Sequence, residues 1–147
     1  MATANDTQIG GNHYAKGGEL QHWDLMDDHR VGYLESAVTK YLTRWQDKDG
    51  VKDLRKADHF LAKLYEKRSA LSFQELVERM PKVPRAEINR FLSANKVTGD
   101  EADIIALVLT WESTAKITLC RGRLSQLIVR AEAEDGSEPT SAYVKQD

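Results

Sequence analysis

Apolar residues recur at steps of three and four along two neighbouring stretches of the chain, between residues 33 and 67. This spacing places them on one face of an α-helix, so it predicts helices over 33–46 and 51–67. The first stretch carries Leu34, Ala37, Val38, Tyr41, Leu42 and Trp45, and the second carries Leu54, Ala57, Leu61, Leu64 and Tyr65. The polar turn between them is short and ends in a glycine, which predicts an antiparallel helical hairpin.

Further helices are predicted after residue 68 from residues typical of helix ends and not from a long periodic stretch. Ser72 is followed by Glu75, and Thr98 is followed by Glu101. Each pair is typical of a capping box, which opens a helix. Prolines at 81 and 84 end one helix and start the next. The three helices predicted here cover residues 72–80, 85–95 and about 99–113.

Residues 116–131 allow two interpretations. Alternating apolar residues around the triplet Arg121-Gly122-Arg123 favour a β-hairpin. Leu124, Leu127 and Ile128 suit a helix equally well. The predicted fold class is therefore mainly α: a helical hairpin domain followed by a small helical module, with one short β-hairpin as the open alternative.

Composition and motif content divide the chain into four segments. Residues 1–8 are polar and are expected to form a disordered lead, and residues 132–147 are expected to form a polar acidic tail. Between them we expect a helical domain over 9–69 and a second small module over 70–131. The second module is either helix-turn-helix-like or an oligomerisation element.

The composition narrows the function classes. The chain has 147 residues, of which 41% are hydrophobic, and its net charge of -2 argues against a protein that coats nucleic acid. One cysteine cannot form an internal disulfide, which fits a reducing cytoplasm. No signal peptide is visible, and the longest apolar run, Ile104 to Leu109, is too short to span a bilayer. We therefore expect a cytoplasmic protein with no membrane association.

A pair of cations in the first predicted helix is the strongest candidate for binding chemistry. Lys40 and Arg44 are four residues apart, so they share one face of the helix and could grip a phosphate chain. A solvated helix face is the alternative interpretation. The full set of candidate ligand-binding residues is His13 and Tyr14 in a glycine-flanked loop, Tyr33, Lys40 and Arg44 on the first helix, and Lys56 on the second.

A carboxylate on the second helix is the candidate for catalysis. Asp53 lies close to Lys56 in sequence, and Asp53 or Asp24 could hold the Mg²⁺ that a phosphoryl transfer would need. Its place early in a helix, where the helix dipole favours negative charge, is the structural alternative. No G-x-x-x-x-G-K-[ST] segment is present, so a P-loop is absent from the sequence.

An ordered set of short motifs runs through the same region. They are Ile9-Gly10-Gly11-Asn12-His13-Tyr14, Trp23-Asp24, Gly32-Tyr33-Leu34, Lys40-Tyr41-Leu42 with Arg44, and Asp53-Leu54 with Lys56-Ala57. In the order and spacing of these motifs, the segment from about residue 9 to residue 67 resembles the SaV-like phage nucleotide kinase family. The resemblance implies a phage or prophage protein in the host cytoplasm and a kinase acting on deoxynucleoside monophosphates.

Three function classes remain open. The first is a nucleotide-binding protein, with kinase activity if it turns its ligand over. The second is a non-catalytic nucleotide-binding or anti-defence protein that acts on a host defence protein. The third is a DNA-binding regulator built on residues 72–131, in which exposed polar residues would contact nucleic acid: Arg85, Asn89, Arg90, Arg121 and Arg123.

The aromatic residues of the predicted hairpin bear on whether the protein forms oligomers. Four of them lie on more than one side of the two helices: Tyr33, Trp45, Phe60 and Tyr65. A two-helix hairpin cannot bury all of these within itself, so either residues 70–131 or a second copy must cover them. We therefore expect a homo-oligomer.

Overall fold

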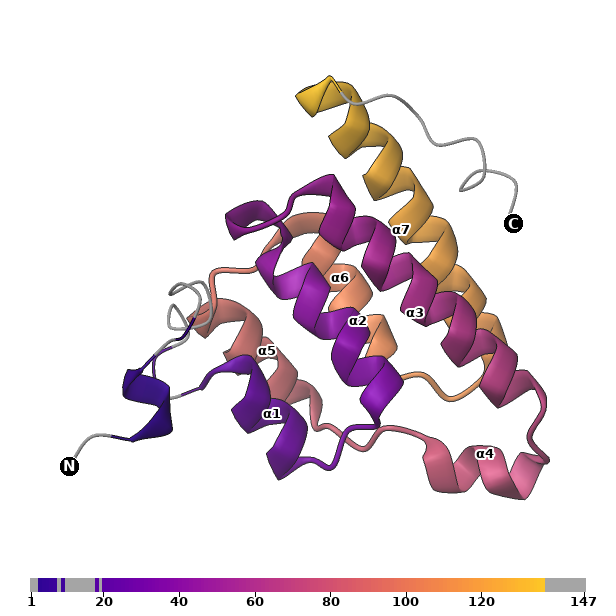
Figure 1. The fold of residues 1–147 in the computed structure, drawn as a ribbon. Coiled ribbons are helices and arrows are strands. Elements are labelled where there is room, and N and C mark those ends of the chain that lie inside the picture. The colour runs from indigo at the N-terminus through magenta and orange to yellow at the C-terminus, as the bar shows by residue number, and fades with distance from the viewer. Residues whose placement is uncertain (1–2, 8, 10–17, 19, 137–147) are drawn as a thin grey trace.

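The computed structural model describes residues 3–7, 9, 18 and 20–136, and over these residues its regular elements are all helices (Figure 1). The mainly α fold class is therefore confirmed. The α-helices are α1 (His22–Asp28), α2 (Tyr33–Arg44), α3 (Val51–Ser69), α4 (Phe73–Arg79), α5 (Arg85–Ala94), α6 (Gly99–Val108) and α7 (Thr114–Asp135). Two short 3-10 helices are η1 (Ala4–Asp6) and η3 (Trp45–Asp47). No helix in this described part of the chain is long and apolar enough to cross a membrane.

The predicted antiparallel hairpin is confirmed as α2 and α3. Ion pairs join the two helices at both ends: Arg44 with Asp53 beside the turn, and Glu35 with Arg68 at the open end. The turn depends on Gly50, whose φ of 59° and ψ of -135° are accessible only to glycine at little cost. Its N–H donates to the carbonyl of Trp45 at 2.7 Å, which reverses the chain between the helices.

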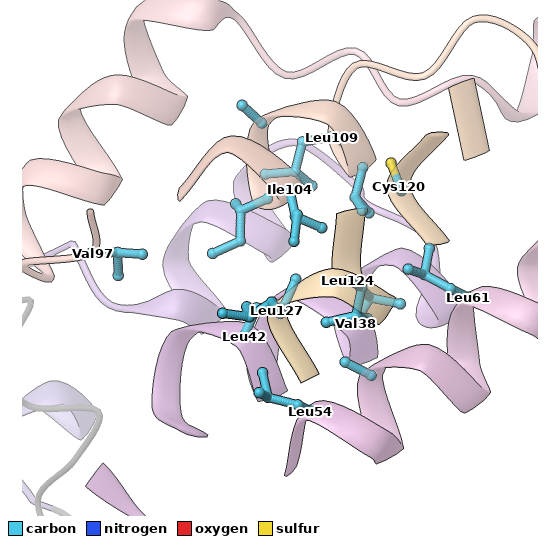
Figure 2. Close-up of a cluster of buried hydrophobic side chains, with 14 of the residues drawn as sticks. Val38, Leu42, Leu54, Leu61, Val97, Ile104, Leu109, Cys120, Leu124 and Leu127 are labelled. Carbon is cyan, nitrogen blue, oxygen red and sulfur yellow. The ribbon is translucent and has the colours of Figure 1, made fainter. Parts of the chain in front are cut away.

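Four helices close a ring around the core. α2 packs on α3, α3 on α7, α7 on α6 and α6 on α2, while α1 and α5 lie beside this ring. Figure 2 shows the shared interior, where Val38 and Leu54 of the hairpin meet Ile104 of α6 and Leu124 of α7. A single apolar cluster thus draws on both the 9–69 and the 70–131 segments, and it fixes the hairpin against the second half of the chain.

The β-hairpin alternative for residues 116–131 is wrong, because this stretch lies within α7. The buried residues of α7 follow a helical period: Ile117, Cys120, Leu124, Leu127, Ile128 and Ala131. The alternating pattern depended on Leu119 and Val129, which are 45% and 60% exposed. Since the helix runs to Asp135, the start of the expected acidic tail is helical, and Glu132 pairs with Arg55 of α3 at 2.7 Å.

One of the two predicted capping boxes forms. The Ser72 hydroxyl accepts from the N–H of Glu75, and the Glu75 carboxylate accepts from the N–H of Ser72. The second pair is wrong as a capping box, because Glu101 instead accepts from the indole N–H of Trp45 at 2.8 Å. Glu101 therefore makes a long-range hydrogen bond in place of the local capping one, and this bond joins α6 to the hairpin turn.

The second half of the chain covers part of the aromatic surface of the hairpin. Trp45 is half-buried against the core through its contact with α6. Tyr33 and Tyr65 stay 76% and 40% exposed. The homo-oligomer stays a prediction.

Candidate functional site

Five of the candidate site residues lie on the α2–α3 hairpin, where two of them are buried and the other three reach the surface. They are Tyr33, Lys40 and Arg44 of α2 and Asp53 and Lys56 of α3. His13 and Tyr14 lie outside the described residues.

Three cations surround one tyrosine ring. Lys40 Nζ lies 5.1 Å from the centroid of the Tyr41 ring, Lys56 Nζ lies 5.4 Å away, and the guanidinium carbon of Arg44 lies 4.7 Å away. These distances fall within the range of cation–π attraction. We call Lys40, Arg44 and Lys56 the cationic cluster. Tyr41 belongs to the apolar stripe of the first predicted helix; it packs half-buried against the core and lies within cation–π distance of all three cations.

A buried carboxylate holds one member of the cluster in place. Asp53 is fully buried, and its two oxygens accept from Arg44 Nε at 3.2 Å and from a terminal guanidinium nitrogen of Arg44 at 3.3 Å. Arg44 itself is only 8% exposed. These contacts describe a carboxylate that orients Arg44, whereas the catalytic role of Asp53 stays a prediction. The cations most accessible to a ligand are therefore Lys40 and Lys56.

The cluster carries more positive charge than its carboxylate neutralises. Burial lowers the pKa of the Lys40 ammonium, and the neighbouring charges of Arg44 and Lys56 lower it further, while Asp53 opposes them. Lys56 Nζ lies 3.9 Å from the exposed carboxylate of Asp49 and 4.0 Å from Asp53. An anion placed between Lys40 and Lys56 would relieve the repulsion that these positive charges exert on one another.

A row of aromatic rings leads away from the cluster. The Tyr41 ring lies 5.9 Å from that of Phe60, and the Phe60 ring packs edge-on to that of Tyr33 at 6.0 Å. Tyr33 is the exposed end of this row. Phe60 was not among the candidates, although it follows Lys56 by four residues and so lies one helical turn away on α3. The row offers aromatic surface on which a planar group could stack.

The histidine of α1 contacts α2 at Thr39, next to Lys40 in sequence. His22 is buried, lies 2.8 Å through Nε2 from the hydroxyl of Thr39, and packs edge-on to Phe91. Burial lowers the pKa of His22 from 6.5 to about 4, and the positive charge of Lys40 contributes to the shift. The imidazole is therefore neutral at pH 7, and it joins α1 to α2 as a hydrogen-bonding group.

This histidine predicts an acid-sensitive fold. The pKa of His22 is lower in the folded than in the unfolded state. The free energy of unfolding is therefore unaffected by His22 above about pH 6.5 and decreases as the pH falls towards 4, because the unfolded state then binds a proton more readily. The loss attributable to His22 should reach about 3 kcal/mol. Urea denaturation between pH 7.5 and 4.5 measures it. His22→Gln, which hydrogen-bonds without titrating, should show a flatter pH dependence, and parallel curves for the two proteins would contradict the prediction.

The candidate residues for nucleic-acid binding do not form a helix-turn-helix. That motif requires its two helices to pack against each other. In Figure 1, α4 and α5 lie well apart, and residues 80–84 between them form no helix. Arg121, one of the residues expected to contact nucleic acid, instead donates to Asp58 of α3 at 3.3 Å. Arg85, Asn89 and Arg90 are exposed on α5, so nucleic-acid binding there stays a prediction.

No metal site is assigned. Within the part of the chain that the structure describes, no three or more histidine, cysteine, aspartate or glutamate side chains gather where they could hold a metal ion. Asp24, the second candidate for Mg²⁺, instead accepts hydrogen bonds from Asn5 and from the N–H of Gln21. The requirement for Mg²⁺ therefore stays a prediction tied to phosphoryl transfer.

Comparison with known proteins adds one finding. Residues 10–62 match the model of a family described as a protein of unknown function, DUF3310. No curated protein and no solved structure matches the chain. The matched stretch contains the cationic cluster and coincides closely with the segment that resembles the SaV-like phage family. Because the description of the matched family states no activity, likeness to a nucleotide kinase stays a prediction.

Proposed function

We propose that the protein binds a nucleotide on the outer face of the α2–α3 hairpin, with the phosphates on the cationic cluster and the base on the aromatic row. The observation that carries this proposal is the convergence of three cations on Tyr41, one of them fixed by a buried carboxylate. A guanidinium held in one orientation loses little entropy when it binds a phosphate. The two lysines beside it supply charges that can reach a ligand.

The length of the face matches a ligand with two distinct ends. Seven residues separate Tyr33 from Lys40, which is a rise of about 10 Å along an α-helix. A ligand that touches both residues is therefore extended, with a planar apolar group at one end and anionic groups at the other. Nucleotides have this chemistry, whereas inorganic phosphate lacks the planar group and a free base lacks the charge.

Binding without turnover is the form of the proposal that the geometry favours. Asp53, the carboxylate closest to the cations, is buried and engaged by Arg44. A general base or metal ligand needs lone pairs that can reach the substrate. Activity as a deoxynucleoside monophosphate kinase is supported by the sequence resemblance alone. A turnover assay on any nucleotide that binds separates a kinase from a protein that sequesters a nucleotide, for example against a host defence system.

The test is a binding screen with charge-removal variants. Calorimetry with mono-, di-, tri- and cyclic nucleotides identifies the ligand. Lys40→Ala and Lys56→Ala should each weaken binding at least about tenfold, because one charge-assisted contact contributes on the order of 1.5 to 3 kcal/mol. Arg44 is a poorer probe, because Arg44→Ala would also leave the buried Asp53 carboxylate without the guanidinium that pairs with it.

Lys63→Ala is the matched control for these variants. Lys63 lies on the same helix as Lys56, is exposed, and pairs with the nearby Glu66 at 3.2 Å. Its removal should leave nucleotide affinity unchanged within about twofold. Equal affinities for the Lys40, Lys56 and Lys63 variants would show that the ligand binds elsewhere.

A further inference from the structure

A second cationic site lies at the open end of the hairpin. A pocket with a volume of about 490 Å³ forms where the ends of α1, α3 and α4 meet. Its walls come from three stretches that are distant in sequence: residues 28–30 with Gly32, Arg68, and residues 78–82. This volume is within the range of pockets that hold small molecules. The chemistry of the lining decides which molecules they are.

Three cations of the lining have no counter-ion. Arg30, Arg79 and Lys82 form no ion pair or side-chain hydrogen bond with any residue that the structure describes. Asp28 and Glu78 also line the pocket, but no cation lies within ion-pair distance of either carboxylate. The positive charges therefore remain available to a ligand, and the His29 side chain lines the pocket beside them.

A buried guanidinium forms part of the same wall. Arg68 is 3% exposed, and one of its terminal nitrogens donates to Glu35 at 3.5 Å. Its Nε is also buried and has no hydrogen-bond partner among the described residues. Burial lowers the pKa of Arg68, Glu35 opposes this effect, and the nearby charge of Arg79 adds to it. Two guanidiniums that repel each other across a pocket favour an anion between them.

The backbone at Arg30 adopts a left-handed conformation. Arg30 follows the C-cap of α1 and has a φ of 53°, a left-handed conformation that glycine adopts at lower cost. The equivalent position after α5 is occupied by Lys96, with a φ of 57°, which lies outside this pocket. The two positions share backbone geometry and charge, and they differ in whether they line the pocket. That difference provides a matched pair of variants.

We infer that this pocket binds a small anion with two or more phosphate groups, separately from the nucleotide site proposed on the hairpin face. Cations approach from two sides, Arg30 from the end of α1 and Arg79 and Lys82 from the end of α4, so one phosphate cannot satisfy them all as well as two can. Multiple unpaired cations and an arginine with an unused donor match the oxygen-rich surface of a polyphosphate. The anion would bridge the end of α1 and the end of α4.

Pyrophosphate is the probe for the first experiment. Calorimetry should show binding to the full chain, with orthophosphate at least about tenfold weaker. Hydrogen–deuterium exchange with pyrophosphate should slow at residues 28–32 and 78–82. The variant Arg79→Ala with Lys82→Ala should weaken binding at least about tenfold. Lys40→Ala with Lys56→Ala should retain the slowed exchange at 28–32 and 78–82, which separates this site from the hairpin face.

The left-handed positions supply the sharpest control. Arg30→Gly and Lys96→Gly each remove a cation and relieve the same backbone strain, so each should raise the melting temperature by roughly 2 to 5 °C. Only Arg30→Gly should weaken pyrophosphate binding. The inference is overturned if pyrophosphate does not bind at millimolar concentration, if protection appears only at residues 33–56, or if Arg30→Gly and the double variant bind like the unaltered protein.

Discussion

Replacing Glu35 with alanine is expected to lower the free energy of unfolding by about 3 to 5 kcal/mol. Glu35 is 1% exposed and accepts hydrogen bonds from two buried donors, Arg68 at 3.5 Å and the indole N–H of Trp111 at 2.9 Å. These bonds join α2 to α3 and to the segment that precedes α7. Without the carboxylate, a buried guanidinium and a buried indole N–H lose their acceptor. A loss of this size is a large part of the stability of a typical small protein.

Urea denaturation of Glu35→Ala and of two reference variants tests this prediction. Glu112→Ala removes an exposed carboxylate that pairs with Lys116 one helical turn away, and it should cost less than about 1 kcal/mol. The double variant Glu35→Leu with Arg68→Met removes both charges, so it should be less destabilised than Glu35→Ala. A Glu35→Ala protein as stable as Glu112→Ala would show that this buried network contributes little.

Asp53→Ala is expected to have a comparable effect at the other end of the hairpin, about 3 to 5 kcal/mol. The change leaves Arg44 mostly buried and removes the carboxylate that both anchors it and offsets the charge of Lys40 and Lys56. The three cations would then repel one another, with the exposed Asp49 beside Lys56. Because the variant carries a stronger positive field, millimolar phosphate or sulfate should raise its melting temperature more than that of the unaltered protein.

Asp49→Ala is the matched control, since Asp49 is exposed and lies 3.9 Å from Lys56. Its removal should change the free energy of unfolding by less than about 1 kcal/mol. If Asp53 acted only in catalysis or metal binding, Asp53→Ala would be as stable as Asp49→Ala and would lose activity alone. That result would contradict the orienting role of Asp53 and support its assignment as a catalytic residue.

The sequence by itself determined most of the helices and the hairpin, whereas residues 116–131 stayed open between a helix and a β-hairpin. Apolar residues at steps of three and four mark the face that a helix buries. A short polar turn between two helices brings them side by side. These signals are local, so α2, α3 and the helix that begins after Ser72 could be predicted. The placement of Tyr33, Lys40 and Arg44 on one stripe followed from the same helical period.

Only the tertiary structure decided how those residues are used. In the sequence, Arg44 is one of two cations on a helix face. In the structure it is buried and paired with Asp53 of the next helix, so Lys40 and Lys56 are the accessible charges. Glu101 has the spacing of a capping residue, yet it binds Trp45, which is distant in sequence. The pocket of Arg30, Arg68 and Arg79 joins three segments that share no local pattern. Such partners meet only after the helices pack, because burial and long-range charge pairing depend on the whole fold and are not encoded in any single stretch of the chain.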